Sequence, residues 1–135
     1  MNGMTVKVYS KSKDGEKKLS TNFRVREFAC QDGSDPVFVS DRLVEVLQAV
    51  RNKFGQPVNI TSGYRTPSHN SKKSVGGAAY SQHLYGTAAD VIVTGVAPAD
   101  VADYLELIMP NYGGIGRYKD FTHVDVRADK SRWNG

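Results

Sequence analysis

The sequence predicts an α+β domain in which helices cover one face of a small antiparallel sheet. Two segments with helical spacing of apolar residues, 41–54 and 99–109, are interleaved with short β-like runs. These runs lie at 58–63, 88–93 and 121–127. The 135 residues, of which 39% are hydrophobic and 24% charged, suffice for one hydrophobic core. We therefore expect a single domain over residues 1–135.

The two helices have recognisable ends. The helix at 41–54 follows Ser40, a good N-cap residue, and stops at Gly55. Its apolar residues recur at helical spacing: Leu43, Leu47, Val50 and Phe54. The helix at 99–109 begins beside Pro98, which suits a first helical position. Both helices are expected to form one wall of the core.

The N-terminal third is less regular. Residues 5–10 alternate between apolar and polar, and Asp14-Gly15 is a hairpin signal. We expect residues 1–18 to be a β-ribbon or an extension at the edge of the domain. The segment 23–30 is expected to form a short helix and 31–36 a loop.

Charge, cysteine content and hydropathy exclude several classes of protein. The formal charge of +4 favours an anionic partner such as a cell-wall polymer, but the basic residues form no stripe, so no nucleic-acid partner is expected. Cys30 is the sole cysteine, which excludes an internal disulfide, and it is expected to be a small buried residue. We expect no signal peptide, no membrane insertion and a monomer.

The stretch "YSQHLYGTAAD" (80–90) suggests half of a metal site. In a helix, His83 and Asp90 would stand about 10 Å apart, too far to share an ion. Gly86 and the β-like run after it favour a turn that folds the histidine back over the strand carrying the aspartate. A catalytic zinc needs three protein ligands. His123 is the natural third, because it lies on the polar face of the last strand.

Residues around this stretch resemble a known family. "SQHLYGTAAD" followed by "HVD" is similar to the S-x-H-x-x-G-x-A-x-D and H-x-D signature of the M15 peptidases, which are zinc D-alanyl-D-alanine carboxypeptidases and related peptidoglycan endopeptidases. "REFAC", "ITSGYRTPSHN", "GGIGRY" and "FTHVDVR" resemble its small single-domain branch. The resemblance runs from about Leu19 to Trp133. It implies a Hedgehog/DD-peptidase-like fold with a zinc cleft on the sheet face away from the helices, roofed by the 64–82 loop.

The resemblance also implies site residues. Zn²⁺ would be held by His83, Asp90 and His123, with water as the fourth ligand. In some members an acidic residue stands three positions before the second histidine, and here that place is held by Asp120. A regular strand would send Asp120 to the opposite face, so it needs a bend before Phe121 to act as the general base.

Two further candidates accompany these residues. Asp125 is the rival base, because it shares the strand face of His123, although it is equally suited to orienting that histidine or pairing with an arginine. Arg65 matches the family arginine that binds near the substrate carbonyl or carboxylate. His69 could instead join His83 and His123 in a three-histidine site, but the family pattern gives it no ligand role.

The implied function is hydrolysis of peptidoglycan stem peptides next to D-amino acids, by a zinc metallopeptidase of the D-alanyl-D-alanine carboxypeptidase type. One alternative is an endolysin endopeptidase of the L-Ala-D-Glu type. Another is a catalytically inactive domain that retains zinc and binds a cell-wall or partner surface. The bare catalytic domain favours synthesis in the cytoplasm, action on the cell wall, and a phage or prophage origin.

Overall fold

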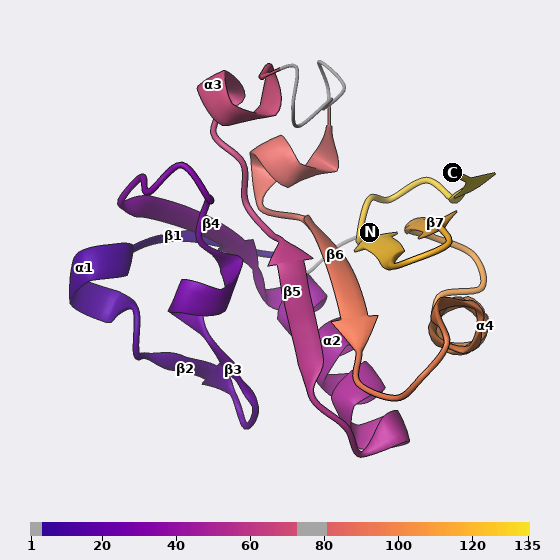
Figure 1. Cartoon of the computed structure of the whole chain (residues 1–135). Helices are drawn as coiled ribbons and strands as arrows, with labels where there is room; N and C mark the ends of the chain where they lie inside the picture. Colours follow the sequence, from indigo (N-terminus) through magenta and orange to yellow (C-terminus); the bar gives the residue numbers. More distant parts are fainter. Residues whose placement is uncertain (1–3, 73–80) are drawn as a thin grey trace.

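A five-stranded sheet and two helices form the body of the domain (Figure 1). The structure, a computed structural model, describes residues 4–72 and 81–135. The strand order is β5-β6-β8-β7-β9. The strands are β5 (Val58–Ser62), β6 (Ala88–Val93), β7 (Gly114–Arg117), β8 (Thr122–Asp125) and β9 (Ser131–Asn134). The predicted α+β class is confirmed.

The principal helices lie where the sequence places them. In α2 (Asp41–Phe54), the Ser40 hydroxyl accepts a hydrogen bond from the Leu43 N–H, and Gly55 ends the helix in the left-handed conformation at φ 65°. In α4 (Pro98–Ile108), proline occupies the first turn. The buried positions on both helices are apolar and belong to the hydrophobic core: Leu43, Val44, Val46, Leu47, Val50, Val101, Ala102 and Leu105.

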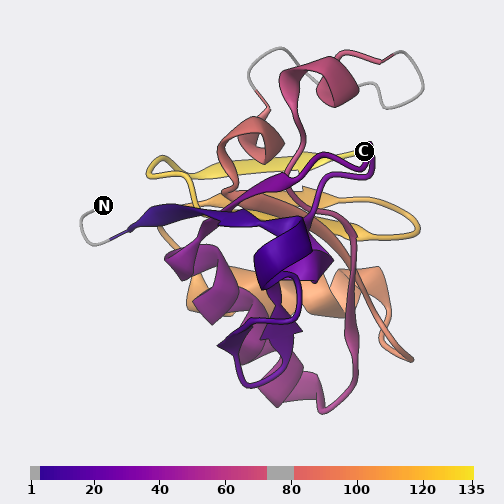
Figure 2. The ribbon, with the colours of Figure 1, turned by 90° about the vertical axis from the view of Figure 1, so that its left-hand side faces the viewer.

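The sheet separates an apolar face from a polar one. Ala89, Val91 and Val124 are 0 to 1% exposed and belong to the core that α2 and α4 cover. Asp90 and His123 alternate with them and therefore point the other way. Figure 2 shows α2 and α4 on one side of the sheet, with α3 (Pro67–Asn70) and the 3₁₀ helix η2 (Gln82–Tyr85) on the other. The predicted arrangement of helices on one face and polar residues on the other is present.

One strand pairing was not expected. β5, β6, β8 and β7 pair antiparallel, but β9 lies parallel to β7. No strand was predicted at Ser131–Asn134, because four residues without an alternating pattern carry little local signal.

The N-terminal residues pair with a distant partner. β1 (Val6–Ser10) runs antiparallel to β4 (Pro36–Ser40), a strand that was not predicted. Asp14-Gly15 does not make a hairpin; it ends α1 (Lys11–Asp14) instead. The Asp14 carboxylate accepts a hydrogen bond from the Ser10 N–H at 3.0 Å, which favours a helical turn over a hairpin turn.

Three short elements complete this region. β2 (Lys18–Ser20) pairs with β3 (Phe23–Arg24), and the 3₁₀ helix η1 (Val25–Phe28) occupies part of the short helix expected at 23–30. None of the described helices is both long and apolar enough to cross a membrane.

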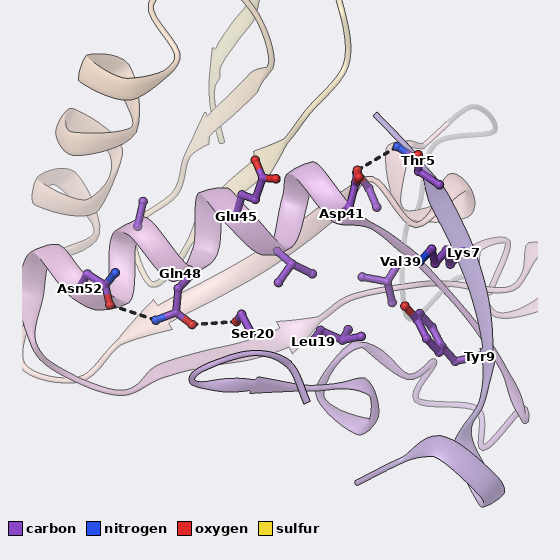
Figure 3. A pocket seen from close by; sticks show the side chains of 13 residues that line it. Thr5, Lys7, Tyr9, Leu19, Ser20, Val39, Asp41, Glu45, Gln48 and Asn52 are labelled. Carbon is purple, nitrogen blue, oxygen red and sulfur yellow. Dashed lines mark hydrogen bonds between the residues drawn. The ribbon is translucent and has the colours of Figure 1, made fainter. Parts of the chain in front are cut away.

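A pocket opens between β1, β2 and α2 (Figure 3). Tyr9 and Leu19 lie on one side of it, and Gln48 on α2 accepts a hydrogen bond from the Ser20 hydroxyl at 2.7 Å. None of the predicted site residues lines this pocket. The predicted metal ligands Asp90 and His123 lie instead on the polar face of the sheet.

Candidate metal centre

Three buried side chains from three elements converge on the polar face of the sheet. His83 lies on η2, Asp90 on β6 and His123 on β8. Their exposed fractions are 2%, 8% and 8%. One ligand atom from each side chain lies within 4.8 Å of those of the other two. Asp90 and His123 face each other directly in the β6–β8 register, so the sheet itself sets their separation.

A turn at Gly86 brings His83 to this pair. Gly86 caps η2 in the left-handed conformation, with φ 71°. A Cβ atom at this position would lie 2.3 Å from the Phe38 carbonyl oxygen on β4. Both the backbone angle and the close approach therefore require glycine. The turn predicted between the histidine and the aspartate is confirmed.

The carboxylate of Asp90 joins the two imidazoles. Its Oδ1 lies 3.4 Å from His83 Nε2 and 3.0 Å from His123 Nδ1. The histidine rings stand edge to face at 73°, with centroids 5.3 Å apart. Two ring nitrogens and one carboxylate oxygen thus point toward a common centre.

Hydrogen bonds on the far sides of the rings select the ligand atoms. His83 Nδ1 lies 2.7 Å from the Gly63 carbonyl oxygen and donates to it, so Nε2 is the ring nitrogen that faces Asp90. His123 Nε2 lies 2.8 Å from Asp125 Oδ2 and donates to it, so Nδ1 is the ring nitrogen that faces Asp90 Oδ1, at 3.0 Å. Partners of this kind behind ligand histidines fix the tautomer and the ring orientation. These two nitrogens, one from each ring, are the ones available to a shared metal ion.

Asp125 is fully buried and strongly held. Its Oδ1 accepts from Arg127 Nε at 2.8 Å and from the Gly114 N–H at 3.0 Å, and its Oδ2 accepts from Arg127 Nη2 at 2.7 Å. The side chain is 0% exposed. Because it contacts the ring nitrogen of His123 that points away from Asp90, Asp125 lies behind the histidine and not at the common centre.

The electrostatics of the group favour a cation. Burial raises the pKa of the Asp90 carboxyl, but hydrogen bonds with His123 and His83 outweigh burial and hold that pKa below its ordinary value. Burial lowers the pKa of His123, yet Asp125 and Asp90 reverse this and raise it above 6.5. The two carboxylates therefore attract positive charge, whether a proton or a metal ion. The donor set of two imidazoles and one carboxylate is one that zinc accepts.

Arg65 extends the site on the side of β5. Its Nη2 lies 3.4 Å from Asp90 Oδ2, its Nε donates to Ser62 Oγ at 3.1 Å, and its Nη1 donates to Asn70 Oδ1 at 3.2 Å. The Arg65 N–H also donates to the His83 carbonyl oxygen at 3.0 Å. The guanidinium, with a 13% exposed side chain, is thus positioned beside the metal-ligand group.

The other candidates are placed differently. Asp120 is exposed, and the chain bends at residues 119–120, which is the bend that its predicted role requires. Within the described ranges, no hydrogen bond or ion pair links Asp120 to the three ligands. His69 groups with Cys30 and Asp32, not with His83 and His123. Of the expected 64–82 roof, residues 73–80 lie outside the described part of the chain.

Several residues beside the site were not assigned roles from the sequence. The Trp133 ring lies 4.9 Å from that of His123, centroid to centroid, and Arg127 stacks on Trp133 at 5.5 Å. Gly116 makes room for the indole, because a Cβ there would lie 2.6 Å from it. Only the parallel β7–β9 pairing brings these residues together, so no local pattern could have shown it.

The motifs and the geometry agree with a comparison to known families. The family model described as Peptidase M15 matches residues 19–125, which include all the candidate ligands. The chain belongs to the peptidase M15 family. Within this M15 chain, 85 residues are 35% identical to a zinc D-Ala-D-Ala carboxypeptidase of Streptomyces albus G. The match covers 58% of this chain and 31% of that protein, so the chain spans less than a third of its curated relative.

Proposed function

We propose that this chain is a zinc metallopeptidase that hydrolyses peptidoglycan stem peptides next to D-amino acids, as a D-alanyl-D-alanine carboxypeptidase. The convergence of His83, Asp90 and His123 on one buried centre carries the proposal. The name of the Streptomyces relative, a zinc D-Ala-D-Ala carboxypeptidase, supports the choice of metal and substrate. The formal charge of +4 suits an anionic cell wall.

In this proposal the three residues hold Zn²⁺ through His83 Nε2, His123 Nδ1 and the Asp90 carboxylate. Zinc in such a site supplies Lewis-acid chemistry, because it lowers the pKa of water toward neutrality and polarises a scissile carbonyl. Asp125 is a positioning residue, since its bond to His123 Nε2 keeps Nδ1 free for the metal.

Arg65 is proposed to bind the substrate carbonyl or terminal carboxylate. Its contact with Asp90 at 3.4 Å is longer than a strong charge-assisted hydrogen bond, so Nη2 is able to turn to a substrate oxygen. Ser62 and Asn70 hold the remaining nitrogens and keep the guanidinium at the site.

Asp120 is proposed as the general base that takes a proton from water and returns it to the leaving amine. Its exposure and the bend at residues 119–120 leave the carboxylate free to act. Asp125 is the weaker candidate, because all of its oxygens are engaged by Arg127, Gly114 and His123.

Mass spectrometry of digested peptidoglycan fragments tests the function. The zinc-loaded protein should release free D-alanine from pentapeptide stems, and His83→Ala should not. Cleavage between L-Ala and D-Glu would identify an endopeptidase instead. Digests that are the same for both proteins, with zinc retained by the unaltered chain, would indicate the inactive zinc-binding alternative.

A further inference from the structure

Three side chains away from the M15 site form a second group of potential metal ligands. Cys30 follows η1, Asp32 lies in the loop before β4, and His69 lies on α3. One ligand atom from each lies within 4.8 Å of those of the other two. Cys30 is 2% exposed, His69 is half-buried and Asp32 is exposed. The group is therefore buried at Cys30 and accessible to solvent at Asp32.

The imidazole of His69 carries an unsatisfied nitrogen. Its Nδ1 is buried and has no hydrogen-bond partner within residues 4–72 and 81–135. A buried polar atom without a partner is costly, and native structures rarely leave one. A metal ion is one partner that an imidazole nitrogen accepts.

Thr66 contacts all three members of the group. Its backbone N–H donates to Cys30 Sγ at 3.5 Å, and its hydroxyl donates to Asp32 Oδ2 at 2.7 Å. The same hydroxyl oxygen accepts the His69 N–H at 3.1 Å, as the N-cap of α3. The ligands are therefore held together before any ion binds.

We propose that Cys30, Asp32 and His69 bind a second divalent transition-metal ion, of the class of Zn²⁺. Thiolate, imidazole and carboxylate together suit zinc, whereas Ca²⁺ and Mg²⁺ prefer oxygen ligands alone. The thiolate and the carboxylate balance the charge of a divalent cation. With three protein ligands, one coordination position remains for water.

The second ion would anchor residues 64–66, which include Arg65, to the rest of the domain. Residues 64–66 already run along 28–30, because the Tyr64 N–H donates to the Phe28 carbonyl oxygen at 2.9 Å and the Thr66 N–H to Cys30. An ion bridging Cys30 and His69 closes this segment at its far end. Arg65, which contacts Asp90, is then held between two metal sites.

Cobalt spectroscopy separates this site from the M15 centre. Cys30 is the sole cysteine, and the M15 ligands include no sulfur, so thiolate-to-cobalt charge-transfer absorption in the near ultraviolet reports Cys30 alone. Under anaerobic conditions the full chain loaded with Co²⁺ should show this absorption and bind about two ions. Cys30→Ser should lose the absorption and one ion, while Asp90→Ala should lose one ion and keep the absorption.

His69→Asn provides a variant at a half-buried position, and Ser68→Ala, an exposed neighbour on α3, is the matched control. We expect His69→Asn to lower the affinity for Co²⁺ at this site at least about tenfold, as followed by the thiolate-to-cobalt absorption. Ser68→Ala should leave this affinity unchanged. Absence of thiolate absorption in the unaltered protein would overturn the proposal. Equal absorption in His69→Asn and the unaltered protein would overturn it as well. Neither result bears on the peptidase activity, which depends on the other ligands.

Discussion

Replacing Asp125 with asparagine should weaken zinc binding at the M15 centre, because the change removes the charge that orients His123. Asp125 Oδ2 accepts from His123 Nε2 at 2.8 Å and from Arg127 Nη2 at 2.7 Å. The asparagine amide has the same shape, but its NH₂ group would face at least one N–H donor that now meets a carboxylate oxygen. The side chain is 0% exposed, so water cannot replace the lost bond.

The expected loss has two parts. Removing a carboxylate behind a ligand histidine costs about 10- to 100-fold in metal affinity. The loss of charge-assisted bonds to Arg127 should also lower the free energy of unfolding by about 1–3 kcal/mol. This loss in the free energy of unfolding is smaller than that expected for breaking a fully buried ion pair, because the Arg127 side chain is 31% exposed.

Competition with a chromogenic zinc chelator measures the affinity, and urea unfolding measures the stability. Asp103→Asn is the matched control, because Asp103 also pairs with an arginine, Arg117, at 2.8 Å but is exposed and makes no contact with His123. The control should retain zinc. Unchanged zinc affinity in Asp125→Asn, together with lost turnover, would refute the positioning role and make Asp125 the base.

Three further predictions concern other parts of the chain. Asp120→Asn should keep zinc and lower turnover about 10²- to 10⁴-fold in the peptidoglycan assay; full turnover would exclude Asp120 as the base. Gly86→Ala should destabilise the protein by more than Gly55→Ala in urea unfolding. Both glycines have positive φ, but only at Gly86 would a Cβ meet a backbone carbonyl, that of Phe38 on β4. Equal losses in the free energy of unfolding would contradict this close approach. A hydrogen bond from Ser10 lowers the pKa of Asp35 below 3.8, so its stabilisation holds above that pH and fades as the pH falls through the lowered pKa. The difference in free energy of unfolding between the unaltered protein and Asp35→Asn should therefore shrink on acidification. A difference that stays constant with pH would contradict a stabilising role for ionised Asp35.

Local patterns predicted the helices and the turn at the site. The apolar spacing and the Ser40 and Gly55 caps of α2 act within a few residues, and the observed bounds agree with them. Gly86 likewise acts locally, since a left-handed residue turns the chain wherever it occurs. The burial of Cys30 was also predicted. The hairpin expected at Asp14-Gly15 was wrong, because a dipeptide common to turns serves equally well to end a short helix.

The sequence by itself determined the α+β class, the principal helices and, through its motifs, the family and the candidate ligands. Only the tertiary structure decided which atoms meet: Asp90 Oδ1 with His123 Nδ1, Asp125 with the opposite ring nitrogen, and Cys30 with His69. The physical reason is distance along the chain. Helix spacing and caps are set by neighbours a few residues away, whereas a metal site joins residues that only strand register and packing bring within reach.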